Sequence, residues 1–181
     1  MVDSTIDRVS AQEFMALPES NMPMELIEGE IIVSPTPNIP HQRLVFKLGK
    51  LVEANIPDGE VIIAPMDVYL DDENVFQPDV FWISANGNCK PVENKHFRGA
   101  PDLVIEVLSP STARKDRQAK FTLYEQFGVR EYWLVDPEAQ LIEVYRLVEG
   151  AYGRPAHFGK GETLIAAVLN NAAIALDAVF A

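Results

Sequence analysis

Residues Pro101–Asp136 read PDLVIEVLSPSTARKDRQAKFTLYEQFGVREYWLVD and decide the fold of this chain. Two short apolar runs rich in β-forming residues, Leu103–Leu108 and Tyr132–Val135, flank an amphipathic segment. That pattern predicts a strand, a helix and a second strand. The helix is expected to begin at Ser109-Pro-Ser-Thr and to end at Gly128.

One residue of the first apolar run is chemically out of place. Glu106 stands between Ile105 and Val107, in the middle of a predicted core strand. Burying a carboxylate is costly unless it is paired or protonated. The sequence therefore predicts that Glu106 has a partner: a metal ion, a lysine or a proton.

The composition limits the class of protein. The chain has 181 residues, 48% of them hydrophobic, which suits one folded domain covering residues 1–181. No apolar run approaches the roughly 20 residues of a membrane span, and the N-terminus lacks the pattern of a secretory signal. With Cys89 as the single cysteine, no internal disulfide is possible. We expect a cytoplasmic protein without a membrane partner.

The charge of the chain is strongly negative but uneven. A net charge of −12 and a pI of about 4.6 argue against a passive nucleic-acid binder, which normally carries a basic face. Between Lys90 and Lys120, however, seven basic residues stand against four acidic ones. This cluster is either a solvated helix face or a set of phosphate contacts, with Arg114, Lys115 and Arg117 as the candidates.

Local patterns predict the other elements. In chain order they are a helix capped by Ser10 and Glu13, a hairpin Met24–Val33 with its turn near Gly29, a helix His41–Asn55, a strand Val61–Leu70 interrupted near Pro65, a strand Val75–Ile83, a polar loop Ser84–Gly99, and strands Leu141–Val148 and Gly150–Phe158. These elements predict an α/β (α+β) domain with a central mixed β-sheet and helices packed on it.

Two acids on different predicted strands suggest a metal site. Asp79 follows Pro78 within one strand, and Glu106 lies in another. Neighbouring strands are roughly 5 Å apart, so two carboxylates on one face can share a divalent ion. Mg²⁺ prefers a few carboxylate oxygens together with water, which fits this pair.

A lysine on the following helix completes the constellation. Lys120 lies four residues after Asp116 and four before Tyr124, so the three side chains share one helix face. If that face rims the end of the sheet, the ammonium reaches a metal-bound water. A cation and a metal together would then stabilise the charge of a phosphoryl-transfer transition state.

Several motifs of this chain occur together in one known family. They are Met24-Glu-Leu-Ile-Glu-Gly-Glu-Ile, His41 after a Pro-rich turn, Gln77-Pro-Asp79-Val, Ala100-Pro-Asp-Leu-Val-Ile-Glu106-Val-Leu-Ser-Pro-Ser, Asp116-xxx-Lys120-xxx-Tyr124, and Gly128-Val-Arg-Glu-Tyr-Trp-Leu-Val-Asp-Pro137. With them the chain resembles the PD-(D/E)XK nuclease superfamily and, more closely, its Uma-type restriction-endonuclease-like branch. The resemblance covers nearly all of the chain from about Ser10 onward.

The resemblance implies a restriction-endonuclease-like fold and a metal-dependent endonuclease that uses Mg²⁺ or Mn²⁺ on nucleic acid, most naturally DNA. Pro78-Asp79 would be the Pro-Asp half of the superfamily signature and Glu106 its acidic half. Leu108 stands where the superfamily has its lysine, and the resembling branch selects Lys120 instead. Glu28 and His41 would be accessory groups near the metal.

The residues alone leave other interpretations open. Glu106 could be a structural acid paired with Lys120, and Asp79 could cap a bulge. Glu28 could be a turn acid and His41 a first-turn helix residue with a local hydrogen bond. The chain could then be a catalytically inactive nuclease fold that serves as a binding module, and its acidic surface favours this alternative. If the protein cuts both strands of a duplex, a homodimer is expected, because two sites are needed.

Overall fold

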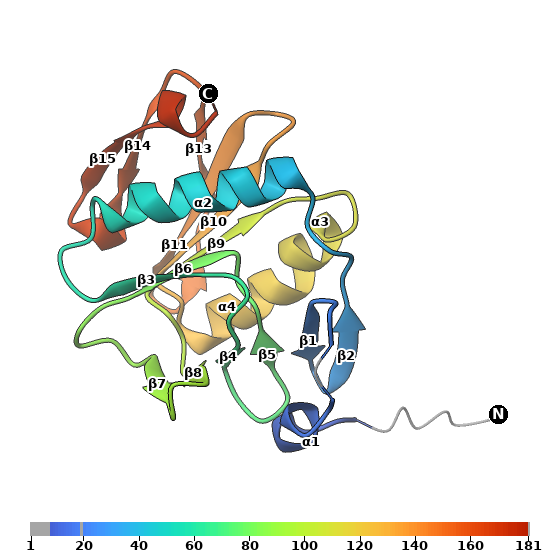
Figure 1. The fold of residues 1–181 in the computed structure, drawn as a ribbon. Coiled ribbons are helices and arrows are strands. Elements are labelled where there is room, and N and C mark those ends of the chain that lie inside the picture. Colours follow the sequence, from blue (N-terminus) through green and yellow to red (C-terminus); the bar gives the residue numbers. More distant parts are fainter. Residues whose placement is uncertain (1–7, 19, 181) are drawn as a thin grey trace.

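The structure is a computed structural model that describes residues 8–18 and 20–180 (Figure 1). Its larger sheet joins strands in the order β12, β11, β10, β9, β6, β3, with β13 also paired to β11. The pair β9–β10 is parallel and the other pairs in this sheet are antiparallel, so the predicted mixed sheet is confirmed. The bounds are β3 Glu60–Ile63, β6 Val80–Ile83, β9 Leu103–Val107, β10 Glu131–Asp136, β11 Leu141–Val148, β12 Ala151–Tyr152 and β13 Ala156–Gly159.

The other described strands form two smaller sheets. One runs in the order β2, β1, β5, β4, β8, β7, and the other is the pair β14–β15 near the C-terminus. The bounds are β1 Met24–Ile27, β2 Glu30–Val33, β4 Val68–Tyr69, β5 Val75–Phe76, β7 Lys90–Val92, β8 His96–Arg98, β14 Thr163–Ala166 and β15 Ala172–Ala175. Short 3-10 turns, η2 Ala167–Leu169 and η3 Leu176–Ala178, follow the last two strands.

The helices begin and end close to their sequence signals. They are α1 Ala11–Met15, α2 Ile39–Glu53, α3 Ala113–Lys115, the π-helical turn η1 Asp116–Lys120, and α4 Phe121–Phe127. Ser10 and Glu13 form the predicted capping box of α1. Gly128 ends α4 in the left-handed conformation, with φ of 86°, as glycine readily does. Among the described residues no helix is long and apolar enough to cross a membrane.

Alternation along β9 explains how two helices cover the larger sheet. Leu103, Ile105 and Val107 lie in the core cluster that includes α2, whereas Val104 and Leu108 lie in the cluster that includes α4. Because side chains alternate between the faces of a strand, Glu106 is directed toward the α4 side. The out-of-place acid therefore faces the helix that carries the predicted lysine.

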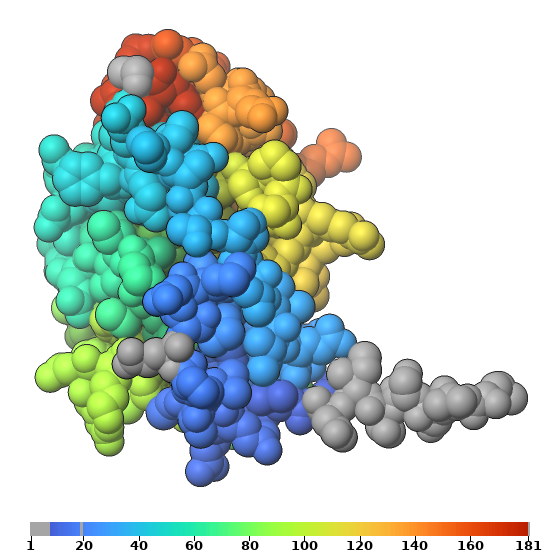
Figure 2. All heavy atoms as spheres, turned by 45° about the vertical axis from the view of Figure 1, so that its right-hand side comes forward, coloured from blue at the N-terminus to red at the C-terminus, as the bar shows by residue number. Residues whose placement is uncertain are grey.

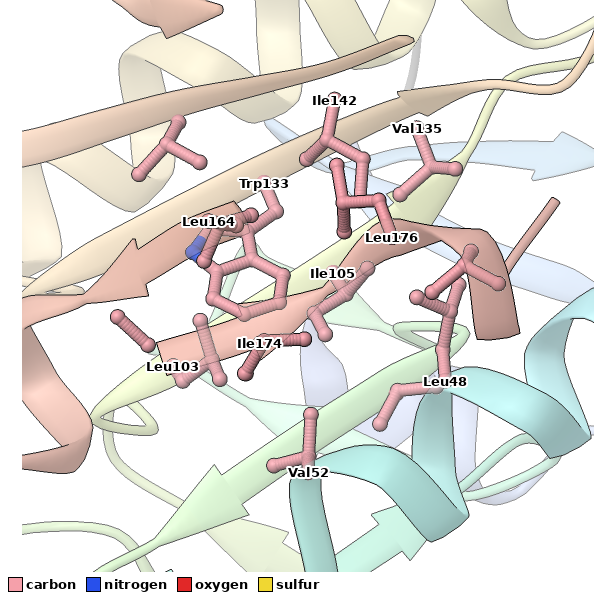
Figure 3. Packing of buried hydrophobic residues seen from close by; sticks show 14 of the residues in the cluster. Leu48, Val52, Leu103, Ile105, Trp133, Val135, Ile142, Leu164, Ile174 and Leu176 are labelled. Carbon is pink, nitrogen blue, oxygen red and sulfur yellow. The ribbon is translucent and has the colours of Figure 1, made fainter. Parts of the chain in front are cut away.

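The α2 side of the sheet is a dense apolar core. Leu48 and Val52 of α2 pack toward Ile105 and Trp133 (Figure 3). At Gly49 the helix comes so close to β3 that an added Cβ would lie 2.8 Å from a methyl carbon of Ile63. The core thus fixes α2 tightly over the strands that carry the candidate acids.

Four sequence predictions need correction. The expected strands Val61–Leu70 and Val75–Ile83 are each split between two sheets, at Pro65 and at Pro78, where proline supplies no N–H to a ladder. The expected strand Gly150–Phe158 is divided into β12 and β13, which both pair with β11. The expected loop Ser84–Gly99 contains the hairpin β7–β8, which the sequence hid because only one residue of its two strands, Phe97, is buried.

Leu48 should be a major contributor to stability. It is fully buried in the α2 core, so Leu48→Ala should lower the free energy of unfolding by about 2–5 kcal/mol in urea denaturation. Ile39 lies on the same helix but is 68% exposed, and Ile39→Ala should change stability by no more than about 0.5 kcal/mol. Equal losses in both variants would contradict this description of the core.

Candidate active site

Acidic and basic side chains from four parts of the chain meet at one cavity of about 540 Å³. Glu25 comes from β1, Asp79 from the residue before β6, Glu106 from β9, and Asp116 with Lys120 from η1. The rim is formed by residues 20–23, 34–38 and 109–112. In Figure 2 the blue segment near residues 34–42 and the yellow segment near residues 109–116 appear on the same face of the molecule.

The strand acid Glu106 and the helix lysine Lys120 are in direct contact, as in the structural alternative of the sequence analysis. Lys120 Nζ donates to Glu106 Oε1 at 2.7 Å, and both side chains are at most 5% exposed. The hydroxyl of Tyr124, one helical turn further, donates to the same oxygen at 2.9 Å. Asp116, one turn earlier, lies with its Oδ1 3.7 Å from the ammonium. The shared helix face inferred from the sequence thus lies over Glu106.

Glu25 was not predicted as a site residue, yet it links the two halves of the cluster. Its Oε1 lies 2.7 Å from Lys120 Nζ, and its Oε2 pairs with Lys115. Its Oε1 also accepts a hydrogen bond from the backbone N–H of Gln77 at 3.1 Å, two residues before Asp79. The signal was available, because Glu25 interrupts an apolar strand as Glu106 does.

Asp79 is held against the strand that carries Glu106. Its Oδ2 accepts a hydrogen bond from the backbone N–H of Val107 at 2.7 Å. His41 Nε2 lies 3.4 Å from the same carboxylate oxygen and 3.2 Å from the Val107 carbonyl oxygen. Since Val80 is paired with Ile105, continuing the register by one residue sets Asp79 opposite Glu106. Asp79, Glu106, Lys120 and His41 are therefore brought together.

The protonation states follow from burial and from competition for two ammonium groups. Burial raises the pKa of Glu106 to about 8, against the opposing effect of Lys120 and with help from neighbouring carboxylates. Burial acts the same way on Glu25, but Lys120 and Lys115 outweigh it and leave that pKa lowered. The pKa of Lys120 is raised well above its usual value, because its carboxylate neighbours outweigh burial. Lys120 is thus a permanent cation.

The pKa of His41 also depends on burial and on an acidic neighbour, Asp79. Burial lowers the pKa of His41, but the hydrogen bond and charge of Asp79 outweigh it, so the net shift is upward. Asn38 caps α2 by accepting a hydrogen bond from the His41 backbone N–H at 2.9 Å. The local hydrogen bond that the sequence suggested is therefore made by the backbone, which leaves the imidazole to face Asp79.

The donor set fits a divalent cation. Glu25, Glu106 and Asp116 contact the ammonium groups of Lys115 and Lys120, and Asp79 contacts His41. If all four carboxylates are ionised, the two ammonium groups balance two of the four negative charges and a protonated His41 balances a third. Asp116 Oδ1 is buried with no hydrogen-bond partner. Among the described residues, no three His, Cys, Asp or Glu side chains are grouped closely enough to hold a metal by themselves. Two carboxylates plus water remain, and that is a typical Mg²⁺ arrangement.

Some predicted residues lie outside this cluster. Glu28 is exposed in the β1–β2 turn and borders a separate depression next to Arg117. The guanidinium of Arg117 donates to both carboxylate oxygens of Glu143, at 2.8 and 2.7 Å. Arg114 is exposed and donates to Gln118 at 3.2 Å. Of the three predicted phosphate contacts, Lys115 alone lines the cavity.

Comparison with known proteins identifies the family. A family model described as "Uma2: Putative restriction endonuclease" matches residues 11–177. This chain belongs to the Uma2 family. The predicted resemblance and the restriction-endonuclease-like fold are both confirmed. The match includes every residue of the cluster.

Two relatives of this Uma2 chain are proteins of Synechocystis sp.. The chain is 32% identical over 154 residues to the uncharacterized protein sll1609 of Synechocystis sp., covering 82% of this chain and 86% of that one. It is 28% identical over 145 residues to slr1290 of the same organism, with coverage of 76% and 74%. A crystal structure described as a putative nuclease belonging to DUF820 from Anabaena variabilis shares the fold, with a TM-score of 0.78, 21% identity, and coverage of 95% and 97%.

The raised pKa of Glu106 gives a prediction for stability without metal. A carboxyl group that titrates near 4.5 when unfolded but near 8 when folded loses stabilisation as pH rises between those values, because the unfolded state ionises first. Glu106→Gln removes this penalty. In urea unfolding with EDTA, the variant should therefore gain stability relative to wild type from pH 5 to pH 8, with little further change above pH 8. If the free energy of unfolding of the variant, minus that of wild type, stays constant or falls from pH 5 to pH 8, the raised pKa of Glu106 is wrong.

Proposed function

We propose that this Uma2 protein is a metal-dependent endonuclease that hydrolyses phosphodiester bonds in nucleic acid, with DNA as the substrate. The observation that carries the proposal is the Lys120–Glu106 contact at 2.7 Å, beside Asp79, on a cavity open to solvent. A buried lysine beside an acid of one strand and an acid that directly precedes the neighbouring strand can hold a metal ion and activate water at a phosphate. The family description and the fold of the structural neighbour support the same reaction class.

Each residue has a separate task in this mechanism. Asp79 and Glu106 would hold Mg²⁺ or Mn²⁺, which when bound supplies a Lewis acid and a water of lowered pKa. Lys120 stays protonated, because its pKa is raised. It therefore serves as a fixed positive charge that orients the attacking water and stabilises charge on the phosphate, and not as a general base.

Glu25 would act as a positioning residue. Its carboxylate contacts Lys120 and Lys115 and accepts the N–H of Gln77. These contacts tie the ammonium to the segment that carries Asp79. His41 would restrain Asp79 from the other side, through the 3.4 Å contact. Lys115, at the cavity, is the predicted phosphate contact retained in the mechanism.

A homodimer acting in the cytoplasm stays a prediction. A duplex has two strands to cut, and a symmetric dimer would supply two sites. No duplex-cutting activity follows from one cavity alone.

The alternative is a nuclease fold that binds without cleaving. The net charge of −12 favours it, because this charge opposes the approach of a polyanion. The ion pairs of Lys120 with Glu25 and Glu106 also give that lysine a purely structural use. Metal binding and cleavage separate the two functions.

The metal site and the lysine can be tested independently. Calorimetry with Mn²⁺ should detect binding to wild type that Asp79→Ala and Glu106→Ala both abolish. Lys120→Ala should still bind Mn²⁺ but lose about 10²- to 10³-fold in the cleavage rate of a labelled oligonucleotide, the usual cost of removing one transition-state donor. Wild type that binds no Mn²⁺ would favour the inactive module. A Lys120→Ala variant that cleaves at the wild-type rate would disprove the role of the lysine.

Two glutamates of one hairpin, Glu25 and Glu28, provide a test of the positioning role and its control. Glu25→Gln should lower kcat about tenfold with little change in KM, because the ammonium is less well oriented while substrate contacts persist. Mn²⁺ affinity should stay near the wild-type value. Glu28→Gln alters the same residue type at an exposed position and should behave as wild type. Equal effects of the two substitutions on kcat would refute a positioning role for Glu25.

A further inference from the structure

The outer face of α2 combines basic and apolar side chains next to the cavity. Ile39, Arg43, Phe46 and Lys50 follow the spacing of one helix face and are all exposed. We call these four residues the α2 ridge. Ile39 and Phe46 are 68% and 57% exposed, among the largest values for apolar side chains in the described residues. The ridge therefore offers apolar and basic side chains next to one another on one helix face.

The basic residues of the ridge differ from most others in the chain. Arg8, Lys95, Arg98, Lys115, Arg117, Lys120, Arg130 and Arg146 each contact a carboxylate. In the part of the chain that the structure describes, neither Arg43 nor Lys50 has an ion-pair partner. Lys47, on the flank of the same helix, reaches the Val179 carbonyl oxygen at 3.5 Å. The ridge thus presents unneutralised positive charge on a protein whose net charge is −12.

The position of the ridge relates it to the candidate active site. The N-terminal end of α2 lines the cavity through Asn38, His41 and Gln42. The ridge continues away from that end for 11 residues, or about 16 Å of helix. Arg43 and Lys50 are about 10 Å apart along the helix axis, so they would contact different phosphates of one strand. Figure 2 shows α2, in blue to cyan, on the same face as the rim segments.

We infer that the α2 ridge binds the nucleic-acid strand that leaves the cavity, with Arg43 and Lys50 on its phosphates and Phe46 against an unpaired base. The inference rests on the proposed nuclease function and gives it a substrate surface distinct from residues 114–117. Single-strand sites commonly combine cationic side chains with an aromatic ring on which a base stacks. Lys50 Nζ already lies 5.5 Å from the centre of the Phe46 ring, so phosphate and base contacts fall side by side. The occupant is a polyanion, because unpaired positive charge on an acidic protein is complementary to phosphate.

Binding without cleavage tests the inference. Fluorescence anisotropy in EDTA would measure the affinity for a labelled single-stranded oligonucleotide and for the same sequence as a duplex. The variant Arg43→Gln/Lys50→Gln should lose two phosphate contacts. Between 50 and 200 mM salt, wild type should then lose about seven- to twelvefold more affinity than the variant. Phe46→Ala should weaken single-strand binding by about fivefold or more, and duplex binding less.

A charge-matched control and a separate activity assay distinguish the possible failures. Arg154→Gln/Lys160→Gln removes two exposed basic residues elsewhere and should keep the salt dependence of wild type. If the ridge variants bind as wild type while Asp79→Ala still abolishes cleavage, the ridge inference is wrong and the proposed function stands. If wild type neither binds nor cleaves any oligonucleotide, both are wrong. If Ile39→Ala/Phe46→Ala shifts sedimentation from dimer to monomer with no loss of oligonucleotide binding, the ridge joins copies of this chain and the inference is overturned.

Discussion

A carboxylate in the middle of a core strand has to be compensated, and the ammonium of Lys120 compensates Glu106 at 2.7 Å. The rest of the site is arranged around this buried pair. Lys120 can reach Glu106 because η1 and α4 cross over the sheet between the parallel strands β9 and β10. Glu106 points to that helix because the strand alternates its side chains. The same pair accounts for the stability cost of the site and for its chemistry.

The cluster contains more acidic than basic groups, and this imbalance supports a role beyond structure. A purely structural ion pair needs one acid for each base, whereas Lys115 and Lys120 contact three carboxylates and a fourth, Asp79, faces His41. Burial raises the pKa of Glu106 to about 8, and the neighbouring carboxylates add to this effect against the opposing charge of Lys120. Active sites are where such perturbed groups collect. A divalent cation bound here would neutralise the carboxylates and remove the repulsion among them, which would favour its binding.

Much of this could be predicted from the sequence, for identifiable reasons. Glu106 stood out against an apolar run, and the spacing of Lys120 from Tyr124 fixed its helix face. The same reasoning could have selected Glu25, which interrupts β1 in the same way, but the turn acid Glu28 was chosen from the resemblance instead. Strand alternation alone could not show that β1, in the second sheet, brings Glu25 to Lys120.

Other features depended on tertiary contacts that no local pattern carries. The segments around Pro65 and Pro78 change sheets, which a reading of each strand in isolation cannot detect. The π-helical turn Asp116–Lys120 resembles an ordinary helix in sequence, and such turns are frequent at functional sites. Arg117 looked like a phosphate contact until its partner Glu143, on β11, was known. The exposure of the α2 ridge likewise depends on how the opposite face of α2 packs against the larger sheet.

The most direct measurement is a crystal structure of the protein with Mn²⁺, using anomalous scattering to locate the ion. The account predicts one strong peak in the cavity, within coordination distance of carboxylate oxygens of Asp79 and Glu106, with Lys120 still beside Glu106. A cavity without such a peak at saturating Mn²⁺, or an ion held by residues outside the cluster, would contradict it.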